Sequence, residues 1–295
     1  MELPIECKNR ISLLYDNKGE GIILELQKLI DKIIDKYNLT SVSIYKNVTY
    51  NIIISAYNNK WKNIIVKIGI KKREIRREIN FYNKYKNNSN ICKIHVIDKK
   101  NGYIIMENIV PGTKLNSLKT LRERLKVFEE IYNKIDCKKE FLSNLPRYKS
   151  ILYKKFNSIK EKELERYIII AKRLYNEIEM LNLPKYILHG DLHHWNIIKS
   201  EKKWIFIDPV GFLGEKIFDL PVFLQNEFWK YGENEENIKG TIEYTSKQLN
   251  IEKNIIYKSL YINLTLTVMW NIEDNDSKTL IKRNINILNI LEKYI

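Results

Sequence analysis

The sequence is poor in the residues that build covalent or metal-bound scaffolds. Its 295 residues include only three cysteines, and none of them has the CxxC spacing of a zinc ribbon or a redox motif. Neither a disulfide framework nor a cysteine-ligated zinc site is therefore indicated, and the expected environment is a reducing cytoplasm. With only 6 prolines and 10 glycines, the chain also lacks a Pro-rich linker or a low-complexity tail.

Long apolar segments are absent as well. No run reaches the roughly 18 apolar residues that a membrane-spanning helix needs. The first ten residues do not combine a basic stretch with a following apolar stretch, as a secretory signal does. We therefore expect a soluble, cytoplasmic protein without membrane contact, and its 44% hydrophobic content is sufficient for a buried core.

The charge is strongly positive, with 51 Lys and Arg against 36 Asp and Glu and a formal net charge of +15. Such an excess can indicate a nucleic-acid or anionic-surface partner. The lysines, however, are spread through a sequence rich in Asn, Ile and Lys, and residues 208–236 carry seven acids against two lysines. We therefore expect no nucleic-acid partner, and an acidic patch close to the candidate site.

Residues able to carry out chemistry are concentrated between positions 186 and 220, which also hold three of the four histidines. A short apolar run leads into a polar loop, and two β-rich runs follow at 196–199 and 204–207, in a pattern typical of strand, loop and hairpin. Asp191 and Asn196 lie in this loop, and Asp208 follows the second run. Carboxylate and amide oxygens at strand ends suit Mg²⁺, which also binds substrate phosphates.

The same segment also allows a zinc site or an ordinary turn. His189 and His193 have the spacing of zinc ligands on a helix, but the glutamate of a zinc-protease motif is missing and Gly190 disfavours a helix. Loop Asp and Asn residues also commonly satisfy turn hydrogen bonds, a role that fits each residue taken alone.

The first third of the chain predicts a helix and an antiparallel sheet. Apolar residues at helical spacing over 20–37 indicate an amphipathic helix, and the period then changes to two, which predicts a three-strand meander from Val42 to Ile68. Lys67 lies near the end of its third strand. The helix expected over 71–85 offers two carboxylates as its partner. We favour Glu78, with Glu74 as the alternative.

Further strands are expected at 93–97 and 102–106, and helices dominate the rest of the sequence. The helices are expected at about 118–135, 148–158, 161–181, 220–231, 237–249, 255–271 and 277–294. A chain of this length fits two lobes around a cleft.

The residues HGDLHHWN at 189–196 and IDPVGFLGEKIFD at 207–219 resemble the aminoglycoside phosphotransferase family, most closely enzymes of the streptomycin 6-kinase type. The resemblance implies an α+β, bilobal, protein-kinase-like fold. Residues 1–107 would form a small β-rich N-terminal lobe that binds the nucleotide on its antiparallel sheet. Residues 108–295 would form a larger helical C-terminal lobe with the catalytic loop and the substrate site.

The resemblance also implies roles for single residues. Asp191 would orient or deprotonate the acceptor hydroxyl, Asn196 and Asp208 would hold Mg²⁺, and Lys67 would contact the phosphates of ATP, with GTP as an open alternative. His189 and Asp219 would be structural. Adenine would contact the hinge and two flanking side chains, through Ile65, Glu107, Asn108, Ile109 and Ile198. The turn at 46–49, where a glycine-rich loop would cover the phosphates, contains no glycine.

The expected substrate is a cationic small molecule. Only ten residues separate Asp208 from Asp219, too few for the activation segment of a protein kinase. The resemblance and the acidic patch favour phosphorylation of a streptomycin-like antibiotic by a monomeric resistance enzyme, with substrate contacts from Glu215, Glu227 and Glu233. A solvated helix face would account for this acidity more simply. The alternative functions are kinases of choline-, homoserine- or sugar-like alcohols and a non-catalytic nucleotide-binding protein.

Overall fold

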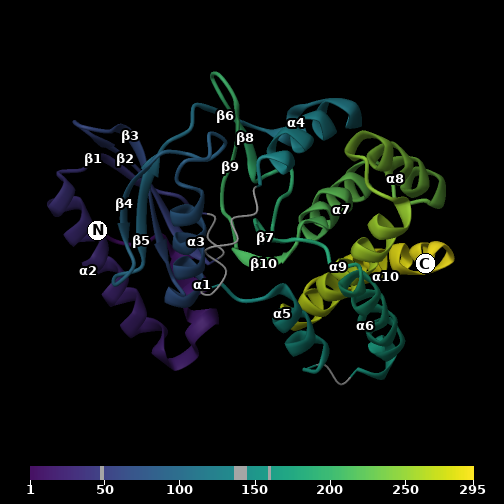
Figure 1. The fold of residues 1–295 in the computed structure, drawn as a ribbon. Helices are drawn as coiled ribbons and strands as arrows, with labels where there is room; N and C mark the ends of the chain where they lie inside the picture. Colours follow the sequence, from purple (N-terminus) through teal and green to yellow (C-terminus); the bar gives the residue numbers. More distant parts are fainter. Residues whose placement is uncertain (47–49, 136–144, 159–160) are drawn as a thin grey trace. The chain divides into compact units, whose positions relative to one another are not determined.

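The computed structural model describes residues 1–46, 50–135, 145–158 and 161–295. These residues form two compact units, Met1–Gly112 and Thr113–Ile295 (Figure 1). Most of the expected phosphate-covering turn, residues 47–49, lies outside the described residues, as does Cys137.

The described residues of the first unit form three α-helices and one five-stranded sheet. In chain order these are α1 (Ile5–Tyr15), α2 (Gly19–Tyr37), β1 (Thr40–Ile44), β2 (Asn51–Asn58), β3 (Lys62–Gly69), α3 (Lys72–Tyr85), β4 (Ile94–Asp98) and β5 (Tyr103–Glu107). The strands pair antiparallel in the order β1-β2-β3-β5-β4, so the expected meander is confirmed. Helix α1 was not predicted, because it buries only Cys7 and Ile11 and exposes Ile5 and Leu13.

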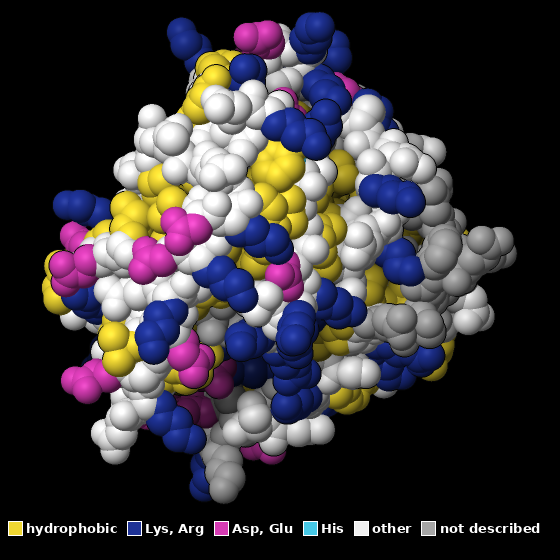
Figure 2. Space-filling model, turned by 90° about the vertical axis from the view of Figure 1, so that its left-hand side faces the viewer, with side chains coloured by type: hydrophobic (Ala, Val, Ile, Leu, Met, Phe, Trp, Pro, Cys, Tyr) yellow, Lys and Arg dark blue, Asp and Glu magenta, His cyan; other side chains and the backbone are white. Residues whose placement is uncertain are grey.

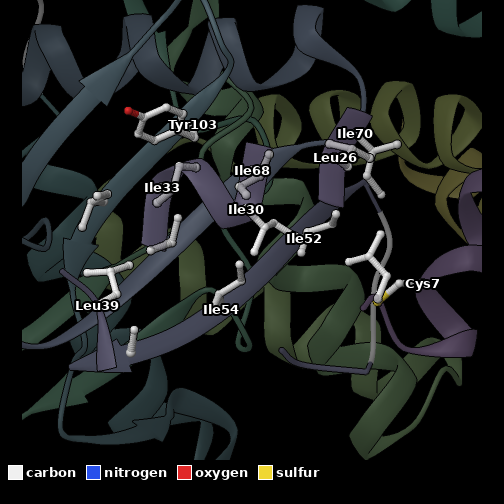
Figure 3. Close-up of a cluster of buried hydrophobic side chains, with 14 of the residues drawn as sticks. Cys7, Leu26, Ile30, Ile33, Leu39, Ile52, Ile54, Ile68, Ile70 and Tyr103 are labelled. Carbon is white, nitrogen blue, oxygen red and sulfur yellow. The ribbon is translucent and has the colours of Figure 1, made fainter. Parts of the chain in front are cut away.

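One face of this sheet packs against α2. Side chains alternate between the two faces of a strand, and the buried Ile52 and Ile54 of β2 lie on the same face as Ile68 of β3. Ile30 and Ile33, which the helical period places on one side of α2, cover them (Figure 3). This core leaves the opposite face of β3, which carries Ile65 and Lys67, to the helix that follows.

Helix α3 approaches β3 closely on its other side. A Cβ atom built on Gly69, the last residue of β3, would lie only 2.5 Å from Cβ of Ile75 in α3. Only glycine therefore allows the helix to approach the end of the strand so closely. The approach brings Glu78, one helical turn beyond Ile75, toward the strand.

The packing of α2 predicts a large difference between two substitutions in this helix. Ile30 is 0% exposed, so Ile30→Ala should lower the free energy of unfolding by about 2–5 kcal/mol through lost burial and a cavity. Leu24 is 57% exposed on the same helix, so Leu24→Ala should change it by less than about 0.5 kcal/mol. Urea unfolding followed by circular dichroism measures both, and equal losses would contradict this packing.

The second unit is mainly helical. Its helices are α4 (Leu121–Asn133), α5 (Tyr148–Phe156), α6 (Glu165–Met180), α7 (Leu220–Tyr231), α8 (Glu235–Leu249), α9 (Lys253–Glu273) and α10 (Lys278–Leu291). Helix α9 is buried on nearly all sides, since it contacts α5, α6, α7, α8 and α10. A helix in this position has no exposed polar face, and the buried residues of α9 are mostly apolar, with Ser259, Asn263 and Thr265 as polar exceptions.

Short strands complete the second unit. Strand β7 (Lys185–Leu188) pairs antiparallel with β10 (Phe212–Glu215), and β8 (Ile197–Ser200) pairs with β9 (Trp204–Phe206) in a three-stranded sheet whose third strand is β6 (Pro111–Lys114). The expected strand and hairpin are therefore confirmed. Strands β6 and β10 were not predicted, because β6 begins with a Pro-Gly pair, which is typical of a turn, and β10 contains a glycine.

The surface carries the positive charge in a dispersed form. Lys and Arg side chains occur over much of the face shown in Figure 2, with Asp and Glu side chains and apolar side chains between them. Of the helices in the described part of the chain, none has the length and apolar character needed to cross a membrane.

Candidate active site

Lys67 of the first unit is buried and paired. Its ammonium lies 2.8 Å from Oε1 and 2.7 Å from Oε2 of Glu78, and both side chains are almost completely covered. Of the two carboxylates that the sequence offers, Glu78 is the one that faces Lys67, because the helix faces the strand at this turn. A buried ion pair of this kind holds the lysine in one position.

The residues expected to contact the adenine through their backbone lie at the end of β5 and directly after it. The N–H of Glu107 donates to the carbonyl of Lys93, and the N–H of Asn108 donates to the carbonyl of Asn63. The next residue, Ile109, is buried, yet within the described residues its N–H has no hydrogen-bond acceptor. This N–H therefore fits a ligand that supplies an acceptor, such as the ring nitrogen of adenine.

In the second unit, β7 and β10 support the loop at 189–196. The carboxylate of Asp219, which is fully buried, accepts the N–H of His189 at 2.9 Å through Oδ2 and the N–H of Gly190 at 2.7 Å through Oδ1. These contacts are compatible with the structural role that the family resemblance implied for Asp219. Burial raises the pKa of Asp219 to about 7, although the two N–H groups lower it.

Gly190 has two reasons to be glycine. Its φ angle is +80°, and a Cβ atom at this position would lie 2.6 Å from the ring of Phe212 on the neighbouring strand. Any side chain would therefore push apart the start of the loop and β10.

His189 joins this loop to the segment that carries Asp208. Its Nε2–H donates to the carbonyl of Ile207 at 2.8 Å, and its Nδ1 accepts the N–H of Asp191 at 3.2 Å. The carbonyl of His189 accepts the N–H of Val210. The ring is fully buried and neutral, and burial lowers its pKa to about 4. Hydrogen bonds on both sides of Asp208 therefore fix its place beside the loop, and these contacts are compatible with the structural role expected for His189.

Asp191 and Asn196 contact each other directly. Nδ2 of Asn196 donates to the backbone carbonyl of Asp191 at 2.9 Å and to its Oδ2 at 3.1 Å. Nε2 of His193 lies 3.4 Å from the same carboxylate. Burial acts to raise the pKa of Asp191, but His193, His189 and Asn196 outweigh it, and the pKa lies below its usual range. Asp191 is therefore ionised at neutral pH.

Asp208 is exposed and has an unusual backbone. Its φ angle is +60°, in the left-handed region, and it precedes Pro209, which restricts it further. A non-glycine residue in this conformation is strained by about 1–3 kcal/mol, and such residues are concentrated at functional sites. The hydrogen bonds of Ile207 and Val210 hold this conformation in place.

Asn196 and Asp208 fit a magnesium ion whose remaining ligands come from a nucleotide and from water. Because Nδ2 of Asn196 is used within the loop, its Oδ1 is the oxygen left to face a metal, and Asp208 adds an exposed carboxylate. Among the described residues, no three His, Cys, Asp or Glu side chains converge as metal ligands, so a complete protein cage is missing there. Mg²⁺ commonly takes one or two protein oxygens together with phosphates and water.

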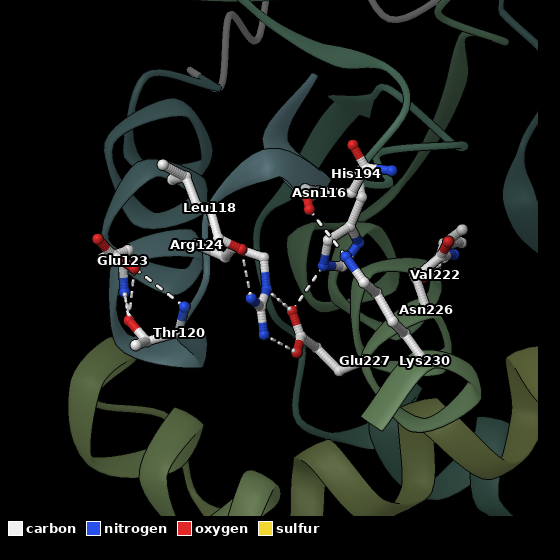
Figure 4. Close-up of polar contacts among 10 residues, drawn as sticks. All are labelled: Asn116, Leu118, Thr120, Glu123, Arg124, His194, Val222, Asn226, Glu227 and Lys230. Atoms are coloured by element: carbon white, nitrogen blue, oxygen red, sulfur yellow. Dashed lines mark hydrogen bonds and ion pairs between the residues drawn. The ribbon is translucent and has the colours of Figure 1, made fainter. Parts of the chain in front are cut away.

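Glu227 does not lie on an acidic surface, contrary to the expectation from the sequence. It is 2% exposed, and both of its oxygens accept hydrogen bonds at 2.6 Å from Arg124 of α4 (Figure 4). His194 approaches Oε1 at 2.6 Å from the loop, and its ring stacks on Phe223. Burial acts to raise the pKa of Glu227, but Arg124 and His194 outweigh it and lower it. Glu227 therefore connects α4, α7 and the loop.

The other two expected substrate contacts are also paired internally. Glu215 is 0% exposed and forms an ion pair with Lys185 of the adjacent strand. Glu233 stays partly exposed, but both of its oxygens accept hydrogen bonds from Arg283. These three glutamates therefore do not form an open acidic patch, because basic side chains of the second unit neutralise them.

Comparison with known proteins now identifies the family. Residues 58–275 match the model of the aminoglycoside/hydroxyurea antibiotic resistance kinase family. The chain belongs to this family. Its membership supports phosphotransferase activity and confirms the resemblance inferred from the motifs.

Individual proteins are similar to this chain either in a short stretch of sequence or in fold. Streptomycin 3''-kinase of Klebsiella pneumoniae is 46% identical over 44 residues, which span 14% of this chain and 16% of that enzyme. Choline kinase LicA from Streptococcus pneumoniae has a TM-score of 0.69 at 19% identity, over 91% of this chain and 99% of LicA. Aminoglycoside phosphotransferase APH(4)-Ia, in a complex with ADP and hygromycin B, has a TM-score of 0.66 at 8% identity, over 90% and 98%. These structures confirm the protein-kinase-like fold.

The two constraints on Gly190 predict a matched contrast within the second unit. Gly190→Ala should lower the free energy of unfolding by about 2 kcal/mol or more, from its positive φ and its contact with Phe212. Gly240 lies inside α8 with nothing within 4 Å of a built Cβ, so Gly240→Ala should be neutral or stabilise by up to about 1 kcal/mol. Thermal unfolding compares the two variants. If both behave alike, the loop is not confined in this way.

Proposed function

We propose that this member of the kinase family transfers the terminal phosphoryl group of ATP to a hydroxyl of a streptomycin-like aminoglycoside, with Mg²⁺ as cofactor. The observation that carries the proposal is the set of hydrogen bonds joining Asp191, Asn196 and the segment around Asp208. Positioning and charge neutralisation account for most of the catalysis in phosphoryl transfer. A fixed loop with ionised oxygens suits that chemistry.

Each residue has a proposed role. Asp191, ionised and held through Oδ2, orients the acceptor hydroxyl and takes up its proton. Asn196 and Asp208 would hold the metal ion, which neutralises phosphate charge when bound. Lys67, held by Glu78, steadies the phosphates, and Ile109 donates its N–H to adenine between the apolar faces of Ile65 and Ile198. The solved relatives with bound ADP support a nucleotide ligand.

Streptomycin is favoured as acceptor by the 44-residue match to a streptomycin kinase. Choline is the second candidate, since the fold is about as similar to choline kinase LicA as it is to APH(4)-Ia. Incubation of purified protein with ATP, Mg²⁺ and a panel of streptomycin, hygromycin B, choline, homoserine and sugars, with mass detection, decides between them. Streptomycin should gain one phosphate, and expression in a susceptible bacterium should raise its tolerance. Transfer to choline alone would leave a kinase and overturn the antibiotic acceptor.

Loss of the Asp191 carboxylate should affect turnover and spare binding. Asp191→Asn keeps the shape of the side chain but removes the proton acceptor, so kcat should fall by about 10²-fold or more. Titration calorimetry should show nearly unchanged affinity for ATP. Asp35→Asn, an exposed change on α2, serves as the control and should leave both quantities unaltered. Near wild-type turnover of Asp191→Asn would remove Asp191 from the reaction.

The role of Asp208 can be tested without turnover. In the wild type, Mg²⁺ should tighten nucleotide binding, because Asp208 supplies the charged protein ligand of the proposed metal site. Asp208→Asn should abolish this gain while weak, metal-independent binding persists. Calorimetric titrations of ATP with and without Mg²⁺ measure the difference for both proteins and for Asp35→Asn. A wild-type protein indifferent to Mg²⁺ would show that the metal site is wrong.

A further inference from the structure

Trp195 is the most exposed residue of the loop at 189–196. Leu192, His194 and Asn196 are 0%, 2% and 8% exposed, whereas Trp195 is 50% exposed. An indole has a large apolar surface, and leaving half of it in water forgoes the stabilisation that burial would provide. Trp is among the residues enriched at binding interfaces, where a partner covers its ring.

The backbone that carries Trp195 is fixed. Its N–H donates to Nδ1 of His193 at 3.1 Å, and the N–H of Asn196 donates to the carbonyl of His193 at 3.0 Å. The neighbour on one side, His194, is anchored to the buried Glu227, and the neighbour on the other, Asn196, to Asp191. The indole therefore projects from a loop that is already ordered, so a ligand that stacks on it would find it preorganised.

A cation already lies over this indole. The ammonium of Lys114, an exposed residue of β6, lies 4.4 Å from the centroid of the Trp195 ring, within the range of a cation–π interaction. No carboxylate within the described part of the chain forms an ion pair with Lys114. The indole face is thus suited to a positive group, and the lysine that uses it is bound by this contact and not by a charge pair.

The three glutamates that the sequence offered as substrate contacts are already paired within the fold. Glu215 and Glu227 are buried and paired, and Glu233 is bonded to Arg283. An aromatic face attracts cations through its quadrupole without a formal negative charge, and it binds planar guanidinium and quaternary ammonium groups well. Trp195 lies four residues from Asp191, in the same hydrogen-bonded loop as the proposed catalytic carboxylate.

We propose that Trp195 is the acceptor-recognition residue of this kinase, stacking on a guanidinium or ammonium group of the acceptor alcohol, and that Lys114 occupies the indole until that group displaces it. The proposal rests on the proposed function, because it assigns the acceptor's charge class at that same site. It makes acceptor selection depend on an aromatic face in place of acidic side chains.

Direct binding tests the proposal independently of turnover. Streptomycin, which carries guanidinium groups, and the neutral polyol myo-inositol are titrated calorimetrically into the full-length protein with ADP present. Trp195→Leu should weaken streptomycin binding by about five- to thirtyfold, since a cation over a desolvated indole contributes about 1–2 kcal/mol. Trp195→Phe should retain most of the affinity. Lys114→Met should tighten binding, because it removes the competing cation. Binding of myo-inositol should not respond to any of these changes.

Trp270→Leu is the matched control, since Trp270 is 37% exposed on α9 and lies outside the loop. It should leave streptomycin binding unchanged. The proposal is overturned if Trp195→Leu binds streptomycin within twofold of wild type, if it weakens myo-inositol equally, or if Lys114→Met weakens streptomycin binding. Failure of the kinase proposal is separate: no panel alcohol would be phosphorylated, while Trp195-dependent binding of streptomycin would still support an acceptor site.

Discussion

The rest of the candidate active site depends on two hydrogen bonds that the buried side chain of Asp219 accepts. Asp219 binds two successive N–H groups at the turn where β7 ends, which fixes His189 and Gly190. His189 then holds Ile207 and Val210 around Asp208, and it also accepts the N–H of Asp191. One desolvated acid thus sets the positions of the proposed base and of one proposed metal ligand, neither of which it touches through its side chain.

A second buried acid holds the other half of the same loop. Glu227 binds Arg124 with both oxygens and His194 with one, so the loop is attached to α4 and α7 at the residue between His193 and Trp195. Breaking such a pair would leave an uncompensated charge in the interior, which costs more than the intact pair contributes. The contacts of both acids therefore hold the loop in place. Glu227 is thus engaged within the fold, and Trp195 is the most exposed residue of the loop.

The sequence predicted contacts whose partners are close along the chain or lie within the motif. Lys67 and Glu78 are eleven residues apart, one on a strand and one on the next helix, and strand and helix periods suffice to bring them together. Arg124 and Glu227 are 103 residues apart, and each lies among ordinary surface charges, so no period indicates that they meet. The prediction that Glu227 belongs to an exposed acidic patch was wrong for this reason. Trp195 was not among the residues proposed from the sequence, because a sequence does not show which loop side chain stays exposed.

His189 of the loop and Asp219, which supports it, have opposite effects on how stability depends on pH. His189 stays neutral in the fold down to about pH 4, whereas in the unfolded chain it binds a proton below about 6.5, so its contribution to stability is lost as the pH falls through that window. Asp219 keeps its proton in the fold up to about pH 7, whereas in the unfolded chain it loses it near 3.9, so its contribution falls as the pH rises through almost the same window. The two slopes offset each other because burial disfavours the charged form of both groups. A loop built on a neutral histidine and a desolvated acid can therefore keep its geometry across the mildly acidic range, while Asp191, whose pKa is lowered, remains ionised at neutral pH for the reaction.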